Sequence, residues 1–172
     1  MKAWPAAPCA HPLPYDEVQA VVWDEVARLR GLGLPACDFV WSFGALPDGL
    51  WGLAYSTTDV DDRILVVIDP DPGAYGEDLE QDVRTTVRHE FGHALTYMLG
   101  FDDASLRATF DAELAGEHLD ADTSLGFEAS AEAIAQALTP PGQARTWFYD
   151  EHVDAEYVDA ARCLLEQAGG AP

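Results

Sequence analysis

The stretch that decides the fold of this chain runs from residue 77 to residue 100 and has the sequence EDLEQDVRTTVRHEFGHALTYMLG. Its apolar residues recur every three or four positions, and Gly100 ends the pattern, so we predict one long amphipathic helix. The apolar side consists of Leu79, Val83, Val87, Ala94, Leu95 and Met98. His89 and His93 are four residues apart in its middle, so both imidazoles point to the same side of the helix.

The segments on either side of this helix predict an α+β fold. Residues 16–32 repeat valine and leucine at helical spacing and end in glycines, which indicates a first helix. Three short apolar segments bounded by Pro, Gly or Asp predict strands, and further helices are expected downstream. The strand segments are 39–43, 50–56 and 64–68, and the later helices are 105–115, 127–138 and 153–168. We expect a small, mostly antiparallel sheet packed on the long helix and on a later helix.

Length and charge limit the classes of function. The 172 residues predict a single domain over 1–172, with 1–14 as an irregular lead-in. No signal peptide and no membrane-spanning stretch is recognisable, and three scattered cysteines predict buried thiols, so we expect a cytoplasmic protein. A formal charge of −22 argues against nucleic-acid and membrane partners. The acidic surface fits solubility, a high-salt cytoplasm or basic substrates, and the sequence does not separate these. Nor does it indicate the oligomeric state.

The segment His89-Glu90-Phe91-Gly92-His93 combines the residue types that a catalytic zinc site requires. Two neutral imidazoles supply two of the three protein ligands of an open tetrahedral site, which leaves a position for water. Zinc lowers the pKa of water towards about 7, and Glu90, on the same side of the helix, can take the proton. We predict one zinc ion per chain on His89 and His93, with Glu90 as general base. The alternative is a polar helix face without metal. Because glycine is costly inside a helix, Gly92 predicts the close approach of another backbone or a ligand.

A third ligand has to come from another segment. The extension of the motif that adds a glycine and a third histidine is excluded, because those places hold Thr96 and Leu99. Asp102 and Asp103 follow closely, and we interpret them as loop or helix-capping residues. Glu128 and Glu132 lie one turn apart in the alanine-rich segment 127–138, where small side chains allow a second helix to approach closely. The alternative for this pair is a solvated acidic face.

These two segments resemble the gluzincin branch of zinc peptidases, in which a helix bearing Glu-x-x-x-Asp follows HExxH. The stretch Glu128-Ala-Ser-Ala-Glu132-Ala-Ile134 is also similar to the Glu-x-x-Ala-Asn-x-Phe-Ala signature of ImmA/IrrE-like peptidases, with Glu132 in place of Asn and Ile134 in place of Phe. The resemblance implies a minimal zincin-like fold. It also implies that Glu128 is the third zinc ligand and that Glu132 accepts the outer N–H of a zinc-bound imidazole.

The same resemblance implies a His or Tyr that stabilises the oxyanion of the reaction. The candidates are His152, Tyr149 and Tyr157. We therefore predict a zinc-dependent hydrolase, a metallopeptidase that cleaves a peptide or protein substrate. If residues 50–56 form the edge of the sheet beside the cleft, an extended substrate can bind there by strand addition. The alternative function is a zincin-fold binding or regulatory protein that keeps zinc without turnover.

Overall fold

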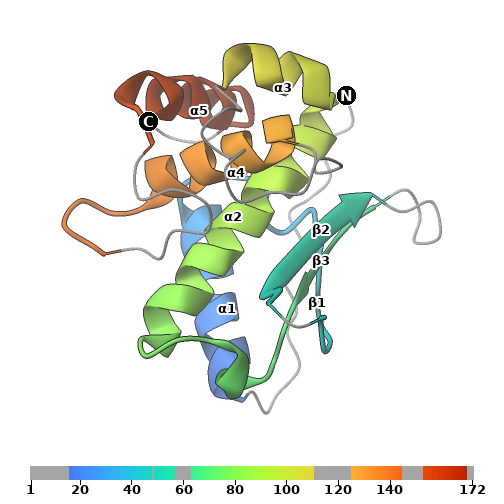
Figure 1. Cartoon of the computed structure of the whole chain (residues 1–172), viewed down its shortest axis with the longest axis vertical. Coiled ribbons are helices and arrows are strands. Elements are labelled where there is room, and N and C mark those ends of the chain that lie inside the picture. The colour runs from blue at the N-terminus through green and yellow to red at the C-terminus, as the bar shows by residue number, and fades with distance from the viewer. Residues whose placement is uncertain (1–15, 48, 57–62, 111–124, 145–152, 170–172) are drawn as a thin grey trace.

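The computed structural model describes residues 16–47, 49–56, 63–110, 125–144 and 153–169 (Figure 1). The α+β class is confirmed, because the described residues form helices and one small sheet. The helices are α1 (Glu17–Gly31), α2 (Leu79–Leu99), α3 (Asp103–Thr109), α4 (Leu125–Leu138) and α5 (Ala155–Gln167), with a short 3-10 helix at Pro72–Ala74. The strands are β1 (Val40–Phe43), β2 (Gly52–Ser56) and β3 (Ile64–Ile68).

The sheet has the order β1-β3-β2, and its strands do not all run as we expected. β2 pairs with β3 in the antiparallel sense, but β1 pairs with β3 in the parallel sense, so the sheet is mixed rather than mostly antiparallel. The reason is that β1 does not pair with β2, its neighbour in the sequence. The chain passes from β1 to the far edge and returns as β3 between them, which leaves β2 as an edge strand.

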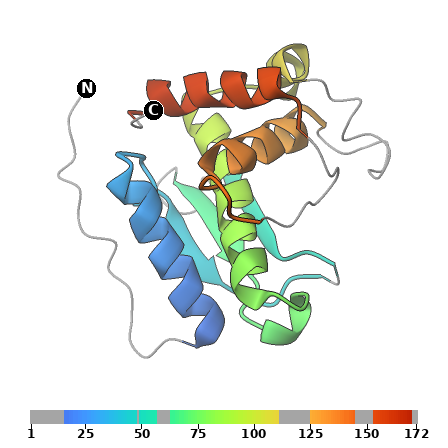
Figure 2. The ribbon, with the colours of Figure 1, turned by 90° about the vertical axis from the view of Figure 1, so that its left-hand side faces the viewer.

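One face of the sheet contributes to the core and the helices cover it. Trp41, Val66 and Ala54 lie side by side in register on the three strands, and all three are buried. α2 packs against β2 and β3 on this side and against α1 along its length (Figures 1 and 2). The predicted apolar stripe of α1 is fully buried, as its helical spacing implies. The stripe consists of Val18, Val22, Val26 and Leu29.

α4 crosses α2 on the side away from α1, and the two helices approach very closely (Figure 1). A Cβ built on Gly92 would lie 2.9 Å from the Cα of Ala131 and 3.3 Å from its Cβ. The prediction from Gly92 is thereby confirmed, since the partner is the backbone of α4. Alanines on α4 allow this approach, and they bring the carboxylates of α4 to the middle of α2.

The segment after α2 fixes the start of α4. Asp102 caps α3 by accepting the N–H of Ser105 at 2.8 Å, which confirms its predicted capping role. Asp103 accepts the N–H of Gly126 at 2.8 Å, so it holds the first turn of α4. α3 begins at Asp103, earlier than predicted, and residues 111–124 lie outside the described residues.

The cysteines differ from our expectation of buried thiols. Cys37 is disulfide-bonded, with its partner outside the described residues, and Cys163 is free and exposed. Disulfides are rare in cytosolic proteins, so this bond weighs against the cytoplasmic location, which stays a prediction. Within the part of the chain that the structure describes, no helix combines the length and the apolar composition needed to cross a bilayer. The single-domain organisation stays a prediction, and its irregular lead-in, 1–14, lies outside the described residues.

Candidate metal centre

Three predicted ligand residues meet where α2 and α4 cross. His89 and His93 lie one turn apart on α2, both are buried, and their Nε2 atoms are 3.1 Å apart. Glu128, in the first turn of α4, places its Oε2 atom 3.2 Å from Nε2 of His89 and 3.3 Å from Nε2 of His93. The three donor atoms therefore form a nearly equilateral triangle.

The size of this triangle fits a metal site. Ligand atoms at 2.0–2.1 Å from a tetrahedrally coordinated zinc ion lie about 3.3 Å from one another. The observed distances of 3.1–3.3 Å agree with this value. His89, His93 and Glu128 are thus positioned to hold a metal ion.

The charges in the centre favour the ligand form of Glu128. Burial raises the pKa of this carboxyl, but the interactions and hydrogen bonds with His93 and His89 outweigh burial and hold the pKa well below its ordinary value. The side chain keeps 17% of its surface exposed. Glu128 is therefore an ionised carboxylate at neutral pH, which is the form that binds a cation.

Glu132 lies on the other side of the His89 ring. Its Oε1 atom is 3.5 Å from Nδ1 of His89, whereas Glu128 contacts the Nε2 atom of the same ring. The two carboxylates of α4 thus occupy different places. Glu128 is part of the triangle of ligand atoms, and Glu132 lies on the opposite side of the His89 ring. For His93, no hydrogen-bond partner of Nδ1 lies among the described residues.

Glu90 points from α2 towards β2. Its side chain is buried, and the backbone N–H of Ala54 in β2 donates a hydrogen bond to its carboxylate. Burial raises the pKa of Glu90, while the neighbouring imidazoles of His93 and His89 act in the opposite direction. The carboxylate is next to the metal centre, and none of the three donor atoms of the triangle belongs to it.

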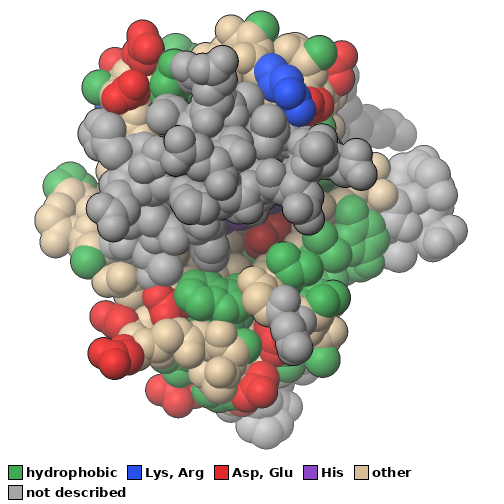
Figure 3. All heavy atoms as spheres, viewed as in Figure 1, with side chains coloured by type: hydrophobic (Ala, Val, Ile, Leu, Met, Phe, Trp, Pro, Cys, Tyr) green, Lys and Arg blue, Asp and Glu red, His purple; other side chains and the backbone are tan. Residues whose placement is uncertain are grey.

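An open cleft of about 220 Å³ leads to this centre. One wall is β2 with the loop before it, and the other consists of the facing turns of α2 and α4. The lining residues are Leu50, Gly52, Leu53, Ala54, His89, Glu90, His93, Tyr97, Phe127 and Glu128. Figure 3 shows acidic and histidine side chains in a hollow at the centre of this face, with hydrophobic side chains beside it in the region where Figure 1 places β2.

Tyr97 is a residue of the cleft that sequence reasoning missed. It lies one turn after His93 on α2, and its ring packs against Phe127 with the centroids 4.9 Å apart. Burial raises the pKa of Tyr97, and the negative charges of Glu128 and Glu90 raise it further, so its hydroxyl stays protonated. The signal was present in the sequence, because the spacing of four residues from His93 places Tyr97 on the ligand side of the helix.

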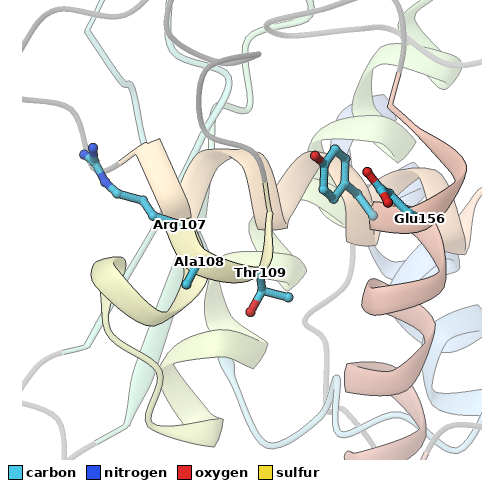
Figure 4. Close-up of a pocket in the computed structure, with 5 residues that line it drawn as sticks. Arg107, Ala108, Thr109 and Glu156 are labelled. Atoms are coloured by element: carbon cyan, nitrogen blue, oxygen red, sulfur yellow. The ribbon is translucent and has the colours of Figure 1, made fainter.

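Of the three predicted oxyanion-stabilising residues, the structure describes only Tyr157. His152 and Tyr149 lie outside the described residues. Tyr157 lines a second cavity of about 400 Å³ between α3 and α5, together with Arg107, Ala108, Thr109 and Glu156 (Figure 4). Its ring packs near Phe110, and it is not among the residues that line the metal cleft.

A buried ionic cluster holds the opposite side of α2. Arg88 precedes His89, is 1% exposed, and donates from Nε to Oε1 of the fully buried Glu25 at 2.7 Å. The other nitrogens of Arg88 reach Thr139 and Gln143, just beyond the end of α4, and Arg84 reaches the second oxygen of Glu25 at 3.0 Å. The cluster therefore joins α1, α2 and the end of α4 behind the metal centre.

Comparison of the chain with protein-family models, with curated proteins and with solved structures finds no match. We therefore infer the function from the geometry of the centre and the chemistry of its residues.

Proposed function

We propose that this protein is a zinc-dependent hydrolase that cleaves peptide bonds. The observation that supports the proposal most strongly is the triangle of His89, His93 and Glu128, with donor atoms 3.1–3.3 Å apart, beside a buried Glu90 that lies outside it. Two histidines and one glutamate are the ligand set of several catalytic zinc sites. A structural site would use a fourth protein ligand, whereas this centre opens into a cleft.

The side chains of the cleft have separate roles in this proposal. A bound zinc ion would lower the pKa of water towards about 7 and polarise the substrate carbonyl. Glu90 takes a proton from water as the water oxygen attacks the carbonyl carbon. It then gives that proton to the amine nitrogen as the C–N bond breaks. Glu132, behind His89, holds the imidazole in the tautomer whose Nε2 lone pair faces the metal.

The place of β2 supports a peptide as substrate. β2 is an edge strand, and its Gly52 and Ala54 line the cleft together with the metal ligands. An extended peptide that adds to this edge would bring its backbone past Glu90. Leu50 and Leu53, which are 45% and 42% exposed, would then contact apolar side chains of the substrate. We also propose that the chain belongs to the zincin-like family and is similar to ImmA/IrrE-like peptidases.

Metal analysis and a charge-neutral variant test the proposal together. Purified protein should contain one zinc ion per chain, and His89→Ala or His93→Ala should lose it, because each removes a ligand. Glu90→Gln should keep the zinc and the fold but lower the rate of cleavage of a peptide library by about 100-fold or more, because it removes only the proton acceptor. Glu77→Gln is the matched control, since Glu77 is exposed and does not line the cleft.

The outcomes separate the alternatives. No zinc in the wild-type protein, or full zinc in both histidine variants, would exclude the site. Zinc with no cleavage of any peptide would instead favour the binding or regulatory protein. Unchanged cleavage by Glu90→Gln would exclude Glu90 as the base.

A further inference from the structure

We infer that the free edge of β2 positions the general base, with Gly52 leaving space for the side chain of Glu90 and the N–H of Ala54 holding its carboxylate. The catalytic part of this inference depends on the proposed function. The contact between Gly52 and Glu90 does not, and it can be measured separately.

The hydrogen-bonding pattern of the sheet shows which groups of β2 face the cleft. The carbonyl of Trp51 accepts the N–H of Asp69, at the end of β3, at 3.0 Å. Backbone groups of alternate residues in an antiparallel pair point to opposite sides, so those of Gly52 and Ala54 point away from β3. The hydrogen bond from Ala54 to Glu90 agrees with this direction. The free edge of β2 therefore faces α2 at Glu90.

Gly52 lies against the side chain of Glu90. A Cβ at this position would be 2.5 Å from Cγ, 2.7 Å from Oε1 and 2.8 Å from Cδ of Glu90. Carbon atoms in favourable contact are about 3.5–4.0 Å apart. Gly52 is not one of the described glycines that have a positive φ. Space for Glu90, rather than backbone conformation, therefore explains the glycine.

The two contacts leave one oxygen of Glu90 available. Oε2 is buried and has no hydrogen-bond partner among the described residues, whereas Oε1 lies against Gly52. An oxygen without a hydrogen-bond partner is the one that can accept a proton. Gly52 and Ala54 act through Glu90, and they are positioning residues in this inference.

A double-mutant cycle on stability tests the contact without any assay of activity. Gly52→Ala should lower the midpoint of thermal unfolding by about 2–4 °C, because Glu90 has to leave its place and its hydrogen bond. The same substitution in a Glu90→Ala background should not lower the midpoint, because the atoms that clash are absent. Gly44→Ala is the matched control, since its Cβ would meet only Cγ1 of Val67 at an ordinary 3.6 Å. Its effect should be the same in both backgrounds.

Kinetics test the consequence for the base. Gly52→Ala should retain one zinc ion, lower kcat by about 100-fold and change KM little, because the proton acceptor is displaced while the ligands stay. If Gly52 instead leaves space for the substrate backbone, KM should rise and kcat should be retained.

Two results would overturn the inference. One is an equal loss of stability when Gly52→Ala is made in the wild type and in the Glu90→Ala background. Failure of both Gly52→Ala proteins to fold counts as this result. The other, in an active wild-type enzyme, is a Gly52→Ala variant with unchanged kcat. If Gly52→Ala alone fails to fold and the double variant folds, the coupling is shown in its strongest form. If the wild type cleaves no peptide, the stability cycle still decides whether Gly52 and Glu90 are coupled.

Discussion

Substitution of Gly92 tests whether the close crossing of α2 and α4 builds the metal centre. In Gly92→Ala the new Cβ would lie 2.9 Å from the Cα of Ala131 and 3.3 Å from its carbonyl oxygen. These are backbone atoms of a helix, so they cannot rotate away as a side chain would. Since favourable carbon–carbon contacts need about 3.5–4.0 Å, the helices must separate by about 0.6–1.1 Å.

This separation exceeds what a metal site tolerates. Ala131 is three residues from Glu128 on the same helix, so the carboxylate moves with it, away from His89 and His93. Metal–ligand distances in proteins vary by only about 0.2 Å. We therefore expect Gly92→Ala to weaken zinc binding by about 10- to 100-fold, the range seen when groups that orient a ligand are removed. Competition with a chromophoric chelator measures this change.

The effect on stability has two opposing contributions. Alanine is favoured over glycine inside a helix by about 1 kcal/mol, whereas overpacking a core costs about 1–3 kcal/mol. Gly31→Ala is the matched control, because Gly31 also lies in a helix and a Cβ there would meet nothing within 4 Å. In the presence of EDTA, Gly92→Ala should unfold about 2–12 °C below Gly31→Ala. Equal midpoints together with wild-type zinc affinity would refute the reasoning.

Three further substitutions probe the other parts of the site. Glu25→Gln should cost about 3–5 kcal/mol at neutral pH, measured by denaturant unfolding, because Arg88 keeps a buried charge without its partner. Burial raises the pKa of Glu25, but the hydrogen bonds from Arg28 and Arg88 outweigh burial and lower it. The wild type should therefore keep this stability above the ordinary pKa of 4.5 and lose it as the pH falls through the lower folded value, whereas the variant should lack this loss. Glu128→Ala should abolish zinc binding, whereas Glu132→Gln should keep the metal with about 10- to 100-fold lower activity. Equal loss of zinc in both variants would contradict the assignment of Glu128 as a ligand and of Glu132 as the partner of His89. Tyr97→Phe should keep zinc and lower kcat by about 10- to 100-fold if its hydroxyl stabilises the oxyanion, and an unchanged kcat would exclude that role.

Much of the fold and the ligand set could be predicted from the sequence, because both depend on spacing along a helix. The periodicity of α2 and the four-residue interval between His89 and His93 are local properties. Gly92 indicated the close approach of a backbone or a ligand, and the structure shows that this backbone belongs to the helix that carries Glu128. The pairing of β1 with β3 was not predictable in this way, because the direction of a strand depends on how the chain crosses the sheet.

The contacts that surround the motif depend on tertiary structure. Glu25 lies seven residues after Val18 and three after Val22, so it falls on the apolar side of α1, and that signal was available in the sequence. Its partners Arg84 and Arg88 were not identifiable, because they lie about 60 residues away on another helix. The contact of Gly52 with Glu90 likewise joins an edge strand to a helix, and no periodicity predicts it.

The order of residues in α2 explains why these distant contacts belong to one site. Successive residues of a helix point in directions about 100° apart, so Arg88, His89 and Glu90 face three different neighbours. Arg88 faces the carboxylate of Glu25 on α1, His89 faces the carboxylates of α4, and Glu90 faces the edge of β2. The ionic cluster on Arg88 resists rotation of α2 about its axis, and any such rotation would move the histidine away from α4 and the glutamate away from β2 together. The buried charges behind the helix therefore stabilise the same orientation that the metal ligands and the base require.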